Sequence, residues 1–207
     1  MVFVINRGYT ENGMEANERG FVKVRVTREA DSYVISYGEI DDQTFTTVTI
    51  AKDPAYNFVF FSFDDGLVNV EPEKGLWDVV MTTGTLLTAF GPGELVPYNF
   101  KDLGLTNQQE MKIKAVEITT EVTYDGFDLD DANALTLEAN RTGIGSSWRK
   151  YNGIQTDPGY DVAEEIFYVI EDPDQNLYKL KFTKMHCLTA ECAGDRGYPE
   201  FTYELLK

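Results

Sequence analysis

The chain has 207 residues, of which 35 are acidic and 18 are basic, and its formal net charge is -17 at pH 7. Such a charge is repelled by nucleic acids and by anionic membrane surfaces, and no long run of Lys or Arg offsets it. No apolar run approaches the ~18 residues that a membrane-spanning helix needs. Hydrophobic residues make up 43% of the chain and aromatic residues 13%, which is enough for one sizeable core, so we expect one domain.

The first third of the chain reads as short strands with one solvated face. Residues 1–20 are rich in glycine and charge and predict a loose or edge-pairing start. Residues 22–26 alternate Val with Lys or Arg, and residues 33–37 return with alternating Tyr and Ile, which predicts a β-hairpin. A further strand is expected over residues 46–50, before the turn signal Asp-Pro.

The segment 56–63 is apolar at every second position on both faces, since Phe58 and Phe60 alternate with Phe61 and Phe63. A strand that is apolar on both faces is typical of the middle of a sheet, so we predict a central strand here. The chain then turns at residues 64–66, and apolar alternation resumes twice between residues 68 and 81.

The middle of the chain is harder to assign. Glycine and proline interrupt residues 84–105, which predicts a long loop or excursion, and loops of this length are often functional. Residues 106–109 fit a capping box, so one short helical turn is expected there, followed by a strand from Met111. Alternation continues over residues 118–124 and again over residues 135–137, which predicts two more strands.

The clearest hairpin is the segment 166–182, where two alternating strands flank a turn that contains Pro173. Proline presets φ for the second position of a turn, and the Asp172 side chain can accept a hydrogen bond from the backbone two residues on. Its second strand has one apolar face and one cationic face, with Lys179 and Lys181 on the latter. With a final strand over residues 201–205, the chain predicts an all-β, antiparallel fold with at most one short helix.

Metal ions have few candidate ligands. Asp125, Asp128, Asp130 and Asp131 are clustered, but an EF-hand calcium loop that began at Asp125 would need Gly at its sixth position and Glu at its twelfth. Those positions hold Asp130 and Thr136, so we expect no bound metal ion.

The two cysteines, Cys187 and Cys192, lie five positions apart beside the single histidine, His186. These three residues cannot complete a four-ligand zinc site of the usual kind. In an oxidising compartment the two cysteines can form a disulfide that closes a short loop, and otherwise they are two thiols.

Several runs, in this order and spacing, resemble the HmuY family of haem-binding lipoproteins of Bacteroidetes. The runs lie at residues 47–50, 56–63, 68–70, 77–78, 144–149, 178–183 and 196–203. The resemblance covers residues 44–207, and it implies a single HmuY-like antiparallel β domain with long loops or finger-like extensions. Residues 1–43 then form an N-terminal extension with a β-hairpin, packed on the main domain.

The resemblance also implies a location and a role. Members of the family are exported, attached to the outer membrane or cell surface through a lipidated cysteine, or secreted. This sequence has neither a signal peptide nor an early cysteine, so the resemblance implies that both have been removed. The expected function is haem binding in haem and iron acquisition, as a hemophore-like carrier that hands haem to a TonB-dependent receptor.

The residues expected to hold haem differ from those of the family, in which two histidines bind the iron. One family histidine corresponds to the segment 151–153 and the other to the segment 121–131. Neither segment contains a histidine here. Haem iron is also bound by methionine, so the remaining axial-ligand candidates are His186, Met14, Met81, Met111 and Met185. Filling the core is the alternative role for each methionine.

Haem propionates attract cations, and Arg141, Arg149 and Lys150 lie close together around Trp148. Because successive side chains of a strand point to opposite faces, Arg149 and Lys150 cannot both serve one pocket. Plain surface placement is the alternative for all three.

Two functions of different classes follow. The first is the haem carrier, and the second is a cell-surface recognition module on the same fold that binds a protein, a glycan or a non-haem ligand. No nucleophile with a base, and no distinct carboxylate pair, marks an enzyme, so we expect a protein without enzymatic activity.

Overall fold

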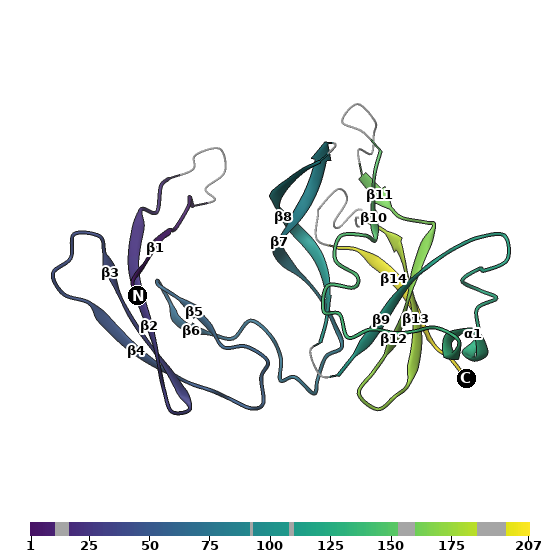
Figure 1. Ribbon diagram of the computed structural model, residues 1–207, viewed down its shortest axis with the longest axis horizontal. Coiled ribbons are helices and arrows are strands. Elements are labelled where there is room, and N and C mark those ends of the chain that lie inside the picture. The colour runs from purple at the N-terminus through teal and green to yellow at the C-terminus, as the bar shows by residue number, and fades with distance from the viewer. Residues whose placement is uncertain (11–16, 92, 108–109, 153–159, 186–197) are drawn as a thin grey trace. The chain divides into compact units, whose positions relative to one another are not determined.

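The computed structural model describes residues 1–10, 17–91, 93–107, 110–152, 160–185 and 198–207. The chain divides into two units, which are Met1–Glu73 and Lys74–Lys207 (Figure 1). The described residues form antiparallel strands with one short helix. The all-β prediction, with at most one short helix, is therefore confirmed.

Unit 1 contains a four-stranded antiparallel sheet in the order β1-β2-β3-β4 and a two-stranded hairpin. The sheet strands are β1 (Phe3–Asn6), β2 (Phe21–Glu29), β3 (Ser32–Glu39) and β4 (Thr46–Ala51), and the hairpin strands are β5 (Phe60–Ser62) and β6 (Gly66–Val68). Val22, Val24 and Ile50 are buried on one face of the sheet, as the alternation predicted. The expected boundary between residues 43 and 44 falls between β3 and β4, which pair with each other, whereas the chain divides after Glu73.

The prediction of a central strand over residues 56–63 is wrong. Within this segment Phe60–Ser62 forms a strand, whose partner among the described residues is β6, and Phe58 and Val59 are 39% and 44% exposed. The aromatic alternation has a different cause, because Phe61 and Phe63 both pack on Tyr37, with ring centroids 5.5 and 5.2 Å away. One face of this segment is therefore covered by an aromatic cluster rather than by a second sheet.

Unit 2 is built on a four-stranded antiparallel sheet in the order β14-β13-β12-β9. The strands of this unit are β7 (Val79–Gly91), β8 (Glu94–Thr106), β9 (Lys112–Glu117), β10 (Arg149–Tyr151), β11 (Tyr160–Val162), β12 (Ile166–Glu171), β13 (Leu177–Lys184) and β14 (Glu200–Leu205). Strands β7 and β8 pair in one hairpin, as do β10 and β11 (Figure 1). The predicted hairpin over residues 166–182 and the predicted final strand are both present.

Strand β12 is the central strand, because it is buried on both of its faces. Tyr168 and Ile170 join one core cluster, with Trp148 and Phe182. On the other face, Phe167 and Val169 join a second cluster, which contains Phe127, Ala132 and Leu206.

The long loop predicted over residues 84–105 is instead the β7–β8 hairpin. The glycine and proline residues that suggested a loop lie at positions of a two-stranded sheet where these residue types are tolerated. The pairing register shifts between Thr82 and Gly84 and between Ala89 and Gly91, and irregularities of this kind accommodate glycine. Pro97 pairs with Leu87 on a strand whose other edge has no strand partner in the described sheet, where a missing N–H is tolerated.

The helix is α1 (Leu129–Asn133), which is not where the sequence predicted it. Asp128 caps α1, because its side chain accepts from the backbone N–H groups of Asp130 and Asp131, and Asp131 completes a capping box. Residues 108 and 109 lie outside the described part of the chain. Thr106, the expected cap, ends β8 and donates its N–H to the carbonyl of Arg141 at 2.9 Å.

The predicted strands over residues 118–124 and 135–137 do not form. Near these residues, Glu138 forms a single isolated bridge with Ile113 of β9. Val122, Tyr124, Leu135 and Leu137 instead pack against the core cluster of Phe127 and Phe167. Their alternation therefore reflects burial of an irregular segment.

The turn between β12 and β13 differs in one contact from its prediction. Gln175 donates its N–H to the carbonyl of Asp172 at 3.0 Å, which closes a turn around Pro173. The Asp172 carboxylate accepts from the N–H of Asn176 at 2.8 Å, so its backbone partner is four residues on rather than two.

Close packing at Gly104 provides a test of this fold. A Cβ atom added there would lie 2.4 Å from Cγ2 of Ile144, so Gly104→Ala overpacks the core, and we expect a loss of about 1–3 kcal/mol in the free energy of unfolding. Urea unfolding followed by tryptophan fluorescence measures it, since Trp77 and Trp148 both belong to unit 2. Gly75→Ala is the control, because a Cβ there meets no atom within 4 Å. Equal stability of the two variants would contradict the packing at Gly104.

Candidate functional site

The segment that carries Trp148 is fixed to the end of β8. Gly104 and Gly145 exchange two backbone hydrogen bonds of 2.9 Å each. The Trp148 side chain is buried, stacks on Phe182 with ring centroids 4.5 Å apart, and donates Nε1–H to the carbonyl of Asp102 at 3.1 Å. These contacts set the position of the next residue, Arg149.

Arg149 forms an ion pair with Asp102, and both side chains are only 11% exposed. Its guanidinium carbon also lies 5.2 Å from the ring centroid of Phe100 and 4.9 Å from that of Tyr160. A guanidinium between two aromatic rings gains cation–π attraction in addition to its carboxylate contact. The Arg149 side chain is therefore held in one place and already has a counterion.

Further aromatic rings extend this contact in both directions. The ring of Tyr98 lies 4.8 Å from that of Phe100, and the ring of Tyr151 lies 4.9 Å from that of Tyr160. We call these five side chains, Tyr98, Phe100, Arg149, Tyr160 and Tyr151, the aromatic row. Its two ends are exposed, and Tyr151 is 54% exposed, so the row offers flat apolar surface to a ligand. It joins the β7–β8 hairpin to the β10–β11 hairpin.

Tyr168 lies beneath the Trp148 segment but does not offer a reactive phenolate. Burial raises the pKa of Tyr168 to about 12, although its hydrogen bond with Ser147 opposes that change. The two hydroxyl oxygens are 2.8 Å apart. Tyr168 therefore remains protonated at neutral pH and acts as a structural contact.

The three candidate methionines that the structure describes, Met81, Met111 and Met185, lie in or against one core. Met111 and Met185 are buried in the same cluster as Trp148 and Phe182, and Met81 packs against that cluster. The Met81 sulfur lies 3.6 Å from the position of a Cβ on Gly104. The structure thus brings Met81, Met111 and Met185 into one region, but it surrounds them with packed side chains. Met14, His186, Cys187 and Cys192 lie outside the described residues.

Two of the three expected propionate partners, Arg149 and Lys150, do not converge. Arg149 is committed to Asp102. Lys150 is exposed and lies 3.6 Å from Glu165, and the alternation of β10 places it on the opposite face from Arg149. Arg141 accepts the N–H of Thr106 through its backbone carbonyl.

Among the described residues, no group of three or more His, Cys, Asp or Glu side chains is placed to hold a metal ion. Within the same residues, no helix has the length and hydrophobicity to cross a membrane.

Lys179 has a role that sequence reasoning missed. Its residue is 3% exposed, and its Nζ donates to the carbonyls of Tyr124 at 2.9 Å and Phe127 at 3.0 Å. Its Nζ also lies 3.3 Å from a carboxylate oxygen of Glu204 on β14. The expected cationic face of β13 is therefore partly buried, and Lys179 anchors the segment before α1. Alternation alone gave no signal of this burial.

Comparison of the chain with protein-family models, curated proteins and solved structures finds no match.

The ion pair between Asp102 and Arg149 of the aromatic row can be tested by a double-mutant cycle. Removing one partner of a buried pair leaves the other charge uncompensated, so we expect Asp102→Asn or Arg149→Met alone to cost about 3 kcal/mol of stability. The double variant should cost less than the sum of the two, because neither charge then remains. Urea unfolding of the four proteins measures the coupling. Additive losses would show that the two side chains do not interact.

Proposed function

We propose that this protein binds haem on the aromatic row and serves as a hemophore-like carrier in haem acquisition. The observation that supports it is the row itself, because exposed rings at both of its ends offer stacking surface to a flat, largely apolar macrocycle. We further propose that the protein binds without turnover.

The residues of the row fit haem better than the methionines do. Met81, Met111 and Met185 pack within or against the core, and a sulfur atom there would reach iron only if the core opened. Tyr151 is exposed at the end of the row. It lies in the segment 151–153, which the resemblance aligns with one of the two family histidines. Tyrosine is an established axial ligand of haem iron, so Tyr151 is the described residue that we assign to this role.

Cations around the row limit how the propionates are placed. Arg149 already pairs with Asp102, and Lys150 lies on the face of β10 opposite to Tyr151. Neither is therefore our first choice as a propionate partner, and we expect the propionates to face solvent. The proposed role at the outer membrane or cell surface, with transfer to a TonB-dependent receptor, derives from the HmuY resemblance.

A second candidate function is a recognition module for a non-haem ligand. The packing of Met81, Met111 and Met185 in or against the core favours it, because it makes these three methionines poor candidates for binding haem iron. In a carrier without methionine ligation we assign the iron to Tyr151 or His186, whereas a recognition module needs neither.

The proposal is tested by a haemin titration, followed in the visible region in both iron oxidation states. We expect a saturable Soret shift for the wild type and roughly 2- to 12-fold weaker binding for Tyr160→Leu, which corresponds to one aromatic contact of about 0.5–1.5 kcal/mol. Tyr151→Phe keeps the ring but removes the oxygen, so it should alter the spectrum of the bound haem more than the affinity. Tyr203→Ala is the control, because Tyr203 is exposed in the same unit but outside the row.

Other outcomes separate the candidates. Loss of the spectral shift in His186→Ala, with Tyr151→Phe unchanged, would assign the iron to His186. The absence of a saturable shift in either oxidation state would overturn haem binding and favour the recognition module.

A further inference from the structure

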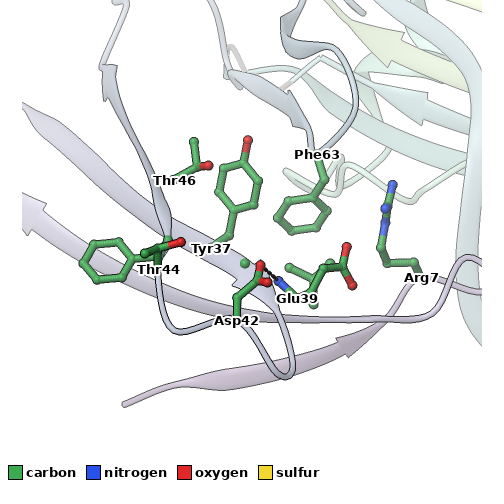
Figure 2. Close-up of a pocket in the computed structure, with 10 residues that line it drawn as sticks. Arg7, Tyr37, Glu39, Asp42, Thr44, Thr46 and Phe63 are labelled. Carbon is green, nitrogen blue, oxygen red and sulfur yellow. Dashed lines mark hydrogen bonds between the residues drawn. The ribbon is translucent and has the colours of Figure 1, made fainter.

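Unit 1 contains a small open pocket between its sheet and the β5–β6 hairpin. Its volume is about 240 Å³, and its lining includes Arg7, Tyr37, Glu39, Thr44, Thr46 and Phe63. Figure 2 shows the rings of Tyr37 and Phe63 side by side, with Glu39 and Asp42 below them and Thr46 beside Tyr37. The pocket belongs to unit 1 alone and shares no residue with the aromatic row.

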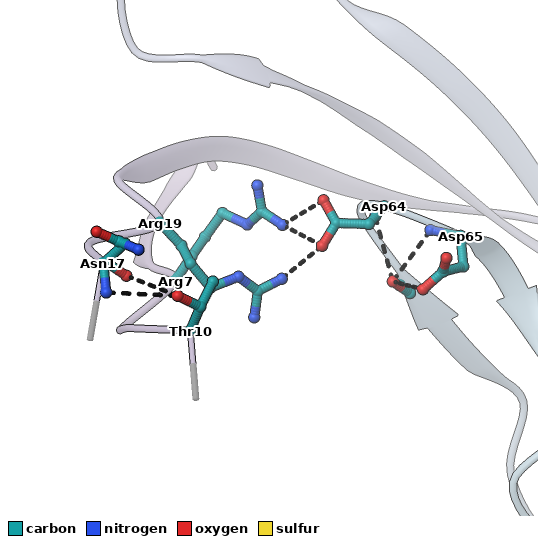
Figure 3. Close-up of polar contacts among 7 residues, drawn as sticks. Arg7, Thr10, Asn17, Arg19, Asp64 and Asp65 are labelled. Carbon is teal, nitrogen blue, oxygen red and sulfur yellow. Dashed lines mark hydrogen bonds and ion pairs between the residues drawn. The ribbon is translucent and has the colours of Figure 1, made fainter. Parts of the chain in front are cut away.

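The wall that carries Phe63 is fixed by a cluster of ionic contacts at the next residue, Asp64. Arg7 Nη2 donates to both carboxylate oxygens of Asp64, at 2.6 and 2.7 Å, and Arg19 Nη2 donates to one of them at 2.5 Å (Figure 3). The guanidinium of Arg7 also lies 5.8 Å from the centroid of the Phe63 ring. These contacts link the start of unit 1 to the hairpin and keep Phe63 against Tyr37.

The opposite wall is fixed by the turn after β3. The Asp42 carboxylate accepts the N–H of Glu39 at 2.8 Å, and Asp42 returns its own N–H to the carbonyl of Glu39 at 3.2 Å. Gly38 lets this turn close, because a Cβ there would lie 3.1 Å from the carbonyl oxygen of Thr44. The acidic side of the pocket is thus set by backbone geometry rather than by a flexible loop.

Several polar groups in the pocket are available to a ligand. Within the part of the chain that the structure describes, the Glu39 carboxylate and the hydroxyls of Tyr37, Thr44 and Thr46 form no hydrogen bond or ion pair with other side chains or backbone groups. A carboxylate only accepts, whereas a hydroxyl both donates and accepts. The pocket therefore pairs two aromatic rings with acceptors and donors, which is the combination that a hydroxylated ring with an apolar C–H face needs.

Size and charge narrow the class of ligand. Pockets for drug-sized ligands measure roughly 300–1,000 Å³, so a pocket of about 240 Å³ is too small for haem and suits a single small ring. Glu39 and Asp42 disfavour an anion. Arg7 disfavours a cation, because Arg7 and Arg19 share the single carboxylate of Asp64 and their positive charge is only partly neutralised. A neutral ligand is therefore favoured. We propose that this pocket binds one neutral sugar ring, which stacks on Tyr37 and Phe63 and is hydrogen-bonded by Glu39, Thr44 and Thr46.

The wall at Phe63 gives this site a pH dependence. The hydrogen bonds from Arg7, the largest effect, lower the pKa of Asp64 below its ordinary value of 3.8; desolvation opposes them, and the hydrogen bond from Arg19 adds to them. A lowered pKa means that the contact is intact above pH 3.8 and is lost as the pH falls through the lower, folded-state value. We expect Asp64→Asn to change the Phe63 aromatic resonances in NMR spectra at neutral pH. In the wild type the same change should occur only at a pH low enough to protonate Asp64. Identical spectra for the variant and the wild type at neutral pH would show that Asp64 does not position Phe63.

The sugar proposal is tested by saturation-transfer NMR on the full chain, with the neutral methyl pyranosides of glucose, galactose, mannose and N-acetylglucosamine. We expect transfer to at least one of them, and none to methyl glucuronide or to tetramethylammonium. Thr46→Val and Glu39→Gln should each weaken binding roughly 2- to 12-fold, as the loss of one hydrogen bond of about 0.5–1.5 kcal/mol does. Thr49→Val and Glu29→Gln are the controls, because both residues are exposed and lie outside the pocket.

Three results would overturn the proposal. The first is the absence of transfer to all four neutral sugars. The second is equal sugar affinity for the pocket variants and the control variants. The third is binding of tetramethylammonium in place of a sugar. Haemin does not fit this pocket, so a failed haemin titration leaves the sugar test unaffected.

Discussion

Burial of β12 on both faces is the constraint on which the rest of unit 2 depends. A strand with Tyr168 on one face and Phe167 on the other must be covered twice, because apolar area left in water costs about 25 cal/mol per Å². One cover is the cluster with Trp148 and Phe182, and the other is the irregular segment on both sides of α1. Each cover then positions something else. The first holds Arg149 in the aromatic row, and the second buries Lys179.

Local pattern predicted the elements whose pairing partners are close in the sequence. The hairpins around residues 30 and 174 were predicted correctly, because alternation and turn residues lie within one stretch of chain. The same pattern failed to distinguish β12 from the segment 56–63, since both are apolar at successive positions. The difference between them is that β12 is flanked by β9, a strand distant in the sequence. β12 has β9 and β13 on its two sides, whereas in the described part of the chain β5 has β6 on one side and no strand on the other.

The candidate site shows the same limit. The sequence marked Arg149 as a cation beside Trp148, but nothing nearby indicated that Asp102 would neutralise it. Likewise, Tyr98 and Tyr160 are far apart in the sequence and meet only through Phe100 and Arg149. Met81, Met111 and Met185 were ambiguous between ligation and packing, and only the three-dimensional arrangement places these three with the core. The pocket of unit 1 was not predicted at all, because its two walls come from different turns.

The pairing of β9 with β12 has a consequence for the order of events in folding. Glu117 meets Ile166 in that ladder, so a long intervening segment must be closed before the pair forms, and such distant contacts slow folding. Until then the hairpin of β12 and β13 is free to form alone, with Phe167 and Val169 exposed on one face and the edge of β12 that pairs with β9 left open. Apolar strand edges that stay open for a long time are sites of intermolecular association. The residues that give the finished molecule its core are thus the ones that a newly made chain must protect longest.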